Sequence, residues 1–217
     1  MTAGAALKRT CMRDHIRDVL VERILDGTYP AGTQLKELAL AREFSVSQAP
    51  IREALRELEG SGLVMSERFR GTRVRGADPR EMRESYELRS MMEERAVELA
   101  VPLTAGLLEA LEQHCRAMAR AVRHSEAERY IDEALSFHRS LIEATGNRTF
   151  LAVWDSLHWN VRGRIALRQI ARKGSGLRPH VELHKTLCAR LRARDVPGAA
   201  RAVRAIFDRV SAVFDDE

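Results

Sequence analysis

The sequence has few cysteines, few lysines and few aromatic residues, and it lacks long apolar runs. Only three of its 217 residues are cysteine and no C-x-x-C pair occurs, which excludes a disulfide framework and a cysteine-based zinc site and favours a reducing cytoplasm. No apolar run approaches the roughly 20 residues that cross a bilayer. Residues 1–8 are too short and too weakly apolar for a signal peptide. We therefore expect a cytoplasmic protein with no membrane partner.

The remaining composition is typical of a folded and mildly basic protein. Hydrophobic residues make up 45% of the chain and charged residues 31%, which leaves enough apolar side chains for a core. The formal net charge is +5, and only four of the 36 basic residues are lysine, so arginine supplies most of the positive charge. Arginine binds phosphates and base edges well, but codon composition can produce the same bias. The positions of the arginines therefore have to decide between the two causes.

A domain boundary is indicated at residues 75–81, where glycine and proline interrupt the chain. Asp78 is a candidate helix N-cap, with Pro79 at the first helical position. The sequence thus predicts one domain over residues 1–76 and a second over 77–217. The second domain has helical periodicity almost to its end and no alternating strand pattern, which predicts a bundle of about six helices. These helices are expected near residues 79–101, 104–124, 126–145, 147–172, 177–194 and 197–214.

The first domain is predicted to be a winged helix-turn-helix. A helix over residues 11–26 precedes a shorter one over 35–43, and a tight turn then leads into a third helix that Ser47 caps. Two short strands are expected over 63–65 and 72–74. The predicted fold class is therefore mainly α, a winged helix-turn-helix followed by an all-α bundle. The inward-facing residues expected on the second helix are Leu35, Leu38 and Ala39.

The third helix and the hairpin have the features that indicate DNA binding. Burial of the helix's apolar stripe leaves a polar outer face at its N-terminus, from which arginine can reach guanine or phosphate in a major groove. The hairpin is basic and has no acidic residue between Glu67 and Asp78, which suits a wing beside the DNA backbone or the minor groove. Each feature alone is more often a solvated surface, but their order and spacing together predict DNA binding. The residues concerned are Gln48, Ala49, Arg52 and Arg56 on the helix and Arg68, Arg70, Arg73 and Arg75 in the hairpin.

Two segments of the first domain resemble the GntR family of bacterial transcription regulators. They are ILDGTYPAGTQL at residues 24–35 and FSVSQAPIREAL at residues 44–55. The second domain resembles the all-helical effector domain, of the FCD type, in the FadR-like branch of that family. The matching segments are ELR at 87–89, FHR at 137–139 and ELH at 182–184. The number of predicted helices is similar to that of the VanR-type subgroup.

This resemblance implies a cytoplasmic, ligand-responsive regulator that binds double-stranded operator DNA and senses a small carboxylate metabolite. It also implies a homodimer formed through the helical half. Two positions differ from the family pattern, because Ser45 stands where glycine is common and Gln48 where arginine is common. Gln48 can pair with adenine, so this change affects the operator sequence that is bound. The predicted DNA contacts are Ser47, Gln48, Ala49, Pro50, Arg52, Arg56, Arg68, Arg70, Gly71 and Thr72.

The resemblance also implies a divalent metal in the helical domain, held by one aspartate and three histidines. Ala134 and Ile206 occupy two of those four positions here, and His138 and His184 occupy the other two. We interpret both histidines as hydrogen-bonded pocket or core residues, without a metal. In the alternative, His180 lies one helical turn before His184 and completes a set of three imidazoles for zinc or nickel.

Arg89 is the main candidate for binding the effector. It lies on a helical row that otherwise faces the bundle, and an inward-facing arginine must be paired. Its partner is either Glu93, one turn later, or the carboxylate of a bound ligand. The predicted effector-binding residues are Arg89, His138 and His184.

Two other classes of function were weighed. A helical metal-dependent enzyme would use His138, His180 and His184, and would need paired carboxylates or a nucleophile beside them. The nearest carboxylate position is Ala134, so no enzyme activity is predicted. A non-specific DNA-packaging protein would need a larger charge excess than +5. The sequence therefore predicts a ligand-responsive, sequence-specific DNA-binding regulator.

Overall fold

The computed structural model describes residues 12–67, 71–75, 78–100, 104–172 and 176–215. Its contacts divide the chain into two units, Met1–Ala77 and Asp78–Glu217. Each unit has its own core, so each is described by itself.

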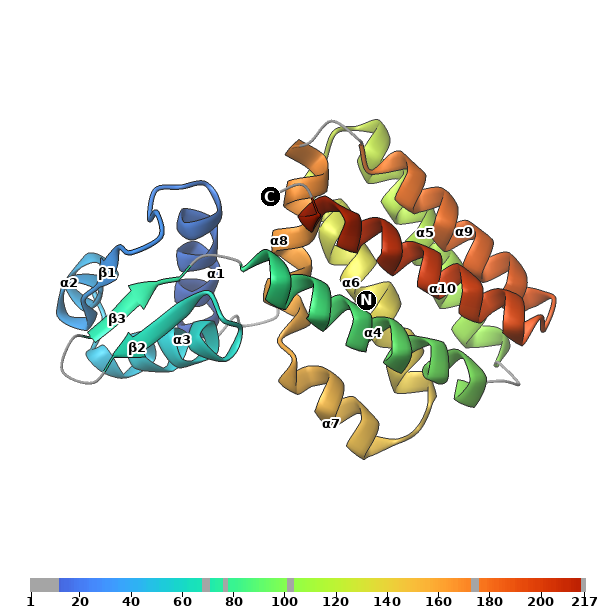
Figure 1. Cartoon of the computed structure of the whole chain (residues 1–217), viewed down its shortest axis with the longest axis horizontal. Coiled ribbons are helices and arrows are strands. Elements are labelled where there is room, and N and C mark those ends of the chain that lie inside the picture. The colour runs from blue at the N-terminus through green and yellow to red at the C-terminus, as the bar shows by residue number, and fades with distance from the viewer. Residues whose placement is uncertain (1–11, 68–70, 76–77, 101–103, 173–175, 216–217) are drawn as a thin grey trace, which may run out of the picture. The chain divides into compact units, whose positions relative to one another are not determined.

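The N-terminal unit is a winged helix-turn-helix, as predicted (Figure 1). Its three strands form one antiparallel sheet in the order β1-β3-β2, in which Val64 pairs with Val74 and Gln34 with Arg73. The sequence did not predict the two-residue strand β1. The elements are α1 (Met12–Leu25), β1 (Gln34–Leu35), α2 (Glu37–Glu43), α3 (Gln48–Gly60), β2 (Val64–Glu67) and β3 (Gly71–Val74).

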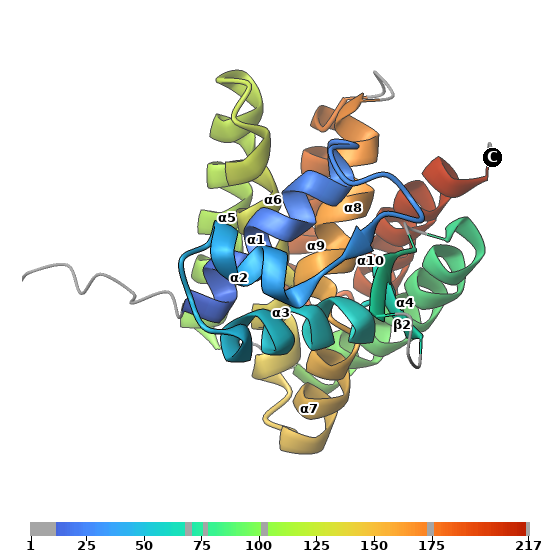
Figure 2. The same cartoon turned by 90° about the vertical axis from the view of Figure 1, so that its left-hand side faces the viewer.

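Helix α3 is held in place by its apolar stripe. Ile51, Leu55 and Leu58 are each at most 4% exposed, which confirms the predicted buried face. Ion pairs add to this packing, because Arg17 on α1 contacts Glu57 on α3 at 2.9 Å. The stripe packs against α1, which lies beside α3 (Figure 2), and the exposed residues of α3 lie on its opposite face.

Helix α2 differs from the prediction in the face that it buries. Leu38 is 52% exposed, whereas Leu40 and Ala41 are buried. The helix begins at Glu37 rather than at Leu35, and Leu35 belongs to β1 instead. The expected inward positions of Leu38 and Ala39, which are both exposed, were therefore wrong, because they were counted from a helix start two residues too early.

Ser45 adopts a left-handed backbone conformation in the turn between α2 and α3, with φ of 54°. Side chains disfavour this conformation, and glycine does not. We expect Ser45→Gly to raise the free energy of unfolding of the N-terminal unit by about 1 kcal/mol, measured by urea titration. Ser47→Gly is the control, because Ser47 has a φ of −71° and gains nothing from glycine. Equal stabilities of the Ser45 variant and the wild type would contradict the strain.

The C-terminal unit is all α in its described residues. Where the sequence predicted one helix over 147–172, the structure has two, separated at Leu157 and His158. His158 has a φ of 51°, which no α-helix can continue through, and neither glycine nor proline marks the break in the sequence. The elements are α4 (Pro79–Ala100), α5 (Ala105–Arg123), α6 (Ala127–Ala144), α7 (Arg148–Ser156), α8 (Trp159–Arg172), α9 (Arg178–Arg192) and α10 (Val196–Ser211), followed by a short 3₁₀ turn (Ala212–Phe214).

These helices pack around an apolar core that also contains charged residues. Helix α4 lies along α10 (Figure 1), and α5 packs against both α6 and α9. Phe137, Leu141 and Tyr86 are almost fully buried in this core. None of the helices within the described ranges combines the length and the apolar character needed to cross a bilayer. The packing brings polar residues of α4, α6 and α9 together inside the bundle.

Candidate functional site

The predicted DNA-reading residues of α3 lie at its N-terminal end and on the face opposite its buried stripe. Ser47 is the N-cap residue, and Pro50 lies in the first turn, where its missing N–H costs no helical hydrogen bond. Exposed positions alternate here with the buried stripe, as a groove-reading helix requires. The exposed residues are Ser47, Ala49, Arg52 and Arg56, and Gln48 and Pro50 are half-buried.

Arg52 is held by two neighbours that the sequence analysis did not connect to it. Its Nε donates to Oε2 of Glu37 at 2.6 Å, and its Nη2 donates to Oε1 of Gln48 at 3.1 Å. The Arg52 side chain is 56% exposed, so this surface pair contributes roughly 0–1 kcal/mol and a base or phosphate can replace it. Glu37 and Gln48 therefore orient the guanidinium without removing it from solvent.

The wing is described only in part, because Arg68 and Arg70 lie outside the described residues. Gly71 is exposed at the start of β3 with a φ of 77°, a conformation that favours glycine. Thr72 differs from the prediction, since it is 9% exposed and its Oγ1 lies 3.2 Å from Oγ of Ser66. Its side chain therefore stabilises the hairpin and is not presented to a DNA surface.

The helical unit contains a buried polar cluster formed by α4, α6 and α9. Nε of Arg89 donates to Oε1 of Glu93 at 2.7 Å, and Oε2 of Glu93 lies 2.5 Å from Nδ1 of His138. Nε2 of His138 lies 3.1 Å from Nε2 of His184. All four residues are at most 4% exposed. The structure thus brings together the three predicted effector residues, Arg89, His138 and His184, and adds Glu93 as the link between them.

Hydrogen bonds define the protonation of this cluster. Nδ1 of His184 donates to the carbonyl oxygen of His180 at 2.6 Å, so its Nε2 accepts from Nε2 of His138. His138 therefore donates from both nitrogens, to His184 and to Glu93, which requires its protonated form, whereas burial acts against that form and lowers the pKa of His138. Burial and the neighbouring His138 lower the pKa of His184 to about 3. Burial would raise the pKa of Glu93, but the charges of His138 and Arg89 and the hydrogen bonds they donate outweigh it and lower the pKa to about 2. Glu93 is therefore the ionised partner of Arg89.

The Arg89 guanidinium is surrounded by aromatic rings. Its Cζ lies 4.7 Å from the ring centroid of Trp159 and 4.9 Å from that of Phe207, with Tyr86 and Trp154 further away. Such contacts stabilise a cation, but the ring faces do not replace hydrogen-bond acceptors for the N–H groups at the edge of the guanidinium. Nη2 of Arg89 is buried and has no hydrogen-bond partner among the described residues, and the same is true of Nδ1 of His180. Two buried donor or acceptor positions are therefore left for a ligand or a water molecule.

A small cavity of about 20 Å³ adjoins the cluster, with Arg89, His138, His180 and His184 among its lining residues. This volume holds about one water molecule. Ala134 and Ile206 also line the cavity, so the two positions that differ from the family's metal ligands lie where those ligands would be needed. Among the described residues, no group of three or more histidine, cysteine, aspartate or glutamate side chains could hold a metal ion. The three-imidazole site with His180 is therefore not formed, and the residues present do not fit a metal.

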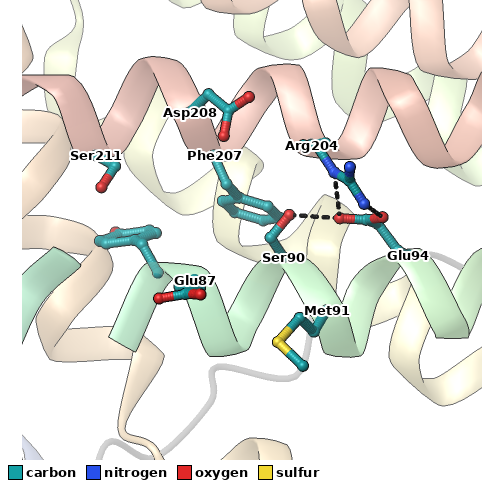
Figure 3. Close-up of a pocket in the computed structure, with 9 residues that line it drawn as sticks. Glu87, Ser90, Met91, Glu94, Arg204, Phe207, Asp208 and Ser211 are labelled. Carbon is teal, nitrogen blue, oxygen red and sulfur yellow. Dashed lines mark hydrogen bonds and ion pairs between the residues drawn. The ribbon is translucent and has the colours of Figure 1, made fainter. Parts of the chain in front are cut away.

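A second, larger hollow of about 290 Å³ lies on the surface between α4 and α10 (Figure 3). Arg204 pairs there with Glu94 at 2.5 Å, and Oγ of Ser90 donates to the same carboxylate at 2.8 Å. Glu87 and Asp208 also line the hollow, which is therefore mainly acidic. No motif in the sequence pointed to it, because its residues come from two helices more than a hundred residues apart.

Comparisons with known proteins agree with both units. Residues 12–74 match the bacterial regulatory proteins of the gntR family, and residues 84–209 match the FCD domain. A Paenarthrobacter nicotinovorans protein named "Probable D-xylose utilization operon transcriptional repressor" is 30% identical over 197 residues, covering 91% of this chain and 86% of its own. The gluconate operon transcriptional repressor of Bacillus licheniformis is 27% identical over 198 residues, covering 89% of this chain and 81% of its own.

A solved structure shows the same fold. E. coli McbR/YncC superimposes with a TM-score of 0.74 at 22% identity, covering 94% of this chain and 97% of its own. The predicted family, fold class and regulatory function are thus confirmed. The chain belongs to the GntR family of bacterial regulatory proteins and is a ligand-responsive, DNA-binding transcription regulator with an FCD effector domain.

Proposed function

We propose that the helical unit binds the carboxylate group of a small metabolite at Arg89, and that binding changes the affinity of a homodimer for double-stranded operator DNA in the cytoplasm. The observation that supports this most directly is the buried Nη2 of Arg89, which lies beside a cavity and has no hydrogen-bond partner in the part of the chain that the structure describes. A guanidinium edge is the protein group best suited to a carboxylate. His180, whose Nδ1 likewise has no partner within the described ranges, offers a second hydrogen bond.

The charges that line the internal cavity and the surface hollow favour the internal cavity as the site for an anion. The surface hollow contains Glu87, Glu94 and Asp208, and its one arginine is paired with Glu94. A carboxylate would be repelled there. One relative is named for a gluconate operon, and gluconate is a small carboxylate. We therefore infer a short carboxylic acid, with sugar acids as the first class to test.

The size of the cavity links ligand binding to movement of the helices. Sites for small molecules commonly have volumes of about 300 Å³ or more, whereas this cavity holds about 20 Å³. The helices must therefore separate to admit a ligand. Gly163 on α8 allows close packing against Leu135 on α6, since a Cβ at Gly163 would lie 2.5 Å from Leu135 Cδ2. We infer that α8 moves when ligand binds, which shifts the population of DNA-binding states.

Isothermal titration with a panel of short mono- and dicarboxylates, gluconate included, tests this site. Arg89→Lys keeps the charge but loses the planar fork, so it should weaken binding at least about tenfold. Arg204→Lys in the surface hollow is the matched control and should bind as the wild type does. An Arg89→Lys protein that binds like wild type would refute the site. A ligand that binds without changing operator affinity would refute the coupling.

Arg52 is expected to contribute to specific DNA binding. Arg52→Ala should lower specific operator affinity by about 1–3 kcal/mol, because a bidentate base contact is lost. Arg70→Ala provides the contrast, since loss of a phosphate contact should weaken all sequences alike and reduce the salt slope by about one. Fluorescence anisotropy with operator and random duplexes measures both effects. Unchanged operator binding by Arg52→Ala would reject the assignment of α3 as the recognition helix.

The exposed face of α4 supports the proposed homodimer. Leu88, Met91 and Leu99 are 42%, 62% and 41% exposed, and they are three of the seven large apolar side chains exposed in the described residues. Two antiparallel copies of α4 that cross at Met91 would place Glu87 of one opposite Arg95 of the other, because each lies four residues from the centre. Two DNA-binding units would then contact a palindromic operator.

Light scattering after size-exclusion chromatography tests the dimer. Met91→Asp should shift the protein toward a monomer, because it places a charge at the centre of the apolar face. Val153→Asp on α7 is the control, since Val153 is 48% exposed but lies on another helix. A Met91→Asp protein that remains dimeric at low micromolar concentration would reject this face as the interface.

The alternative of a helical enzyme has less support. His138 does contact a carboxylate, that of Glu93, which the sequence analysis had not placed beside it. Glu93 is 0% exposed and already accepts from Arg89, so its carboxylate cannot exchange a proton with a substrate in this arrangement. The cluster therefore suits binding better than catalysis.

A further inference from the structure

Two cysteines meet in the core of the helical unit. Cys115 on α5 and Cys188 on α9 are 73 residues apart in the sequence, and their Sγ atoms are 3.5 Å apart. Each residue is 4% exposed, and both are free thiols. Helices α5 and α9 are in direct contact, so the two thiols face each other across a packed interface. The third cysteine, Cys11, lies outside the described residues.

This separation is close to that of a covalent link. A disulfide bond is roughly 2.0 Å long, whereas the two Sγ atoms are 3.5 Å apart. They must therefore approach each other by roughly 1.5 Å, and rotation of the two side chains can supply part of this movement. Neither cysteine belongs to the Arg89 cavity. We propose that Cys115 and Cys188 form a thiol pair that hydrogen peroxide, or another small hydroperoxide, oxidises to an intramolecular disulfide between α5 and α9.

The peroxide is the only co-reactant that this oxidation requires, because it accepts both electrons that the two thiols lose. One cysteine, as its thiolate, attacks an oxygen of the O–O bond, which breaks, and the products are a sulfenic acid and water after protonation. The second cysteine then attacks the sulfenic sulfur, the S–S bond forms, and a second water molecule leaves. The two thiols together lose two electrons and two protons, and hydrogen peroxide is reduced to two molecules of water, whereas an organic hydroperoxide gives one alcohol and one water.

The environment of the pair determines which oxidants react with it. The hydrogen bond with Cys188 and burial raise the pKa of the Cys115 thiol well above its usual range, so little thiolate exists while the helices are closed. A neutral oxidant of about the size of water can enter this region more readily than a bulky or charged disulfide. Oxidation is therefore expected to be slow, and faster when α5 and α9 separate transiently.

The disulfide would also restrain the helix that supplies part of the effector site. Cys188 lies one helical turn after His184, and His180 lies one turn before it, all on α9. A covalent link to α5 at Cys188 fixes the same helix against its neighbour. The closed loop is long, so the bond should raise the midpoint of thermal unfolding of the helical unit by roughly 4–16 °C.

The test uses the full chain with Cys11→Ser, which removes pairing through the third cysteine. The protein is treated with hydrogen peroxide, unfolded, alkylated and digested, and the peptides are analysed by mass spectrometry. We expect a linked peptide that joins α5 to α9, a mass loss of two hydrogens in the intact chain, and the higher unfolding midpoint, reversed by dithiothreitol. Adding Cys115→Ser or Cys188→Ala should abolish all three changes.

Three results would overturn the proposal. The first is a pair that stays alkylatable after prolonged oxidation. The second is oxidation of Cys115 or Cys188 to sulfinic acid without a linked peptide, which would show that the thiols do not reach each other. The third is a disulfide that forms equally fast in protein unfolded with guanidinium, because its formation would not depend on the folded packing.

Discussion

Replacing Glu93 with glutamine is expected to lower the free energy of unfolding of the helical unit by about 3–5 kcal/mol, because it leaves a buried cation without its counter-charge. Glu93 is 0% exposed and accepts hydrogen bonds from Arg89 at 2.7 Å and from His138 at 2.5 Å. Glutamine has nearly the same size, so packing is preserved and the charge is what changes. Arg89 would then keep its aromatic neighbours and a neutral amide but lose its anionic partner.

Urea unfolding of the full chain, followed by circular dichroism, measures this effect. Glu94→Gln is the matched control one residue further along α4, where the carboxylate forms a more exposed pair with Arg204, and it should cost no more than about 1 kcal/mol. In the double variant with Arg89→Met, much of the stability should return, because both charges are removed together. A cost below about 1 kcal/mol for Glu93→Gln alone would show that the buried pair contributes little.

Lowering the pH from 7 to 5 is expected to destabilise the helical unit by about 2 kcal/mol for each of two buried imidazoles. Burial and the charge of Arg209 lower the pKa of His180 to about 4, and burial with His138 lowers that of His184 to about 3. In the unfolded chain both groups take up protons near pH 6.5, whereas in the folded chain they remain neutral. The unfolded state therefore binds more protons, so stability rises with pH over this range and is lost on acidification.

Glu93 also makes the stability of the helical unit decrease on acidification, but at lower pH than the histidines. Its folded pKa of about 2 lies below that of a free carboxyl group, so its contribution is present above about pH 4.5 and lost as the pH falls through 2. Unfolding midpoints measured at a series of pH values should thus fall first between pH 6.5 and 4 and again below that range. His180→Asn should flatten the first decrease, whereas His15→Asn on the exposed part of α1 should not. A profile that is flat from pH 7 to 5 would contradict the buried neutral imidazoles.

Much of the N-terminal unit could be predicted because its signals are local. The stripe of Ile51, Leu55 and Leu58, the N-cap position of Ser47 and the turn at Ser45 are all predicted from residues within a few positions of each other, although the Ser47 side chain makes no capping hydrogen bond among the described residues. The misplaced Leu38 came from the same kind of local reasoning, in which an error of two residues in a helix start reverses the face.

In the helical unit, several features could not be predicted from local sequence patterns. The break between α7 and α8 at His158 has no glycine or proline to mark it, and the closure of the effector cavity depends on how α6 and α8 pack at Gly163. Sequence positions identified Arg89, His138 and His184 as candidates, but they did not connect Glu93 to His138, which lies 45 residues further on. Only packing of the helices brings the two within hydrogen-bonding distance.

The scarcity of cysteine illustrates the same division. The sequence by itself predicted the winged helix-turn-helix through short-range periodicity, and it indicated the family through the resemblance of two segments of the first domain, which the match over residues 12–74 confirms. Its low cysteine content argued against a disulfide framework, and the DNA-reading face stays a prediction. The tertiary structure decided that Cys115 meets Cys188, that Thr72 is buried, and that one carboxylate links an arginine to a histidine pair. Such contacts join residues from different helices or strands, and their distances are set by the packing of whole elements, which no local pattern encodes.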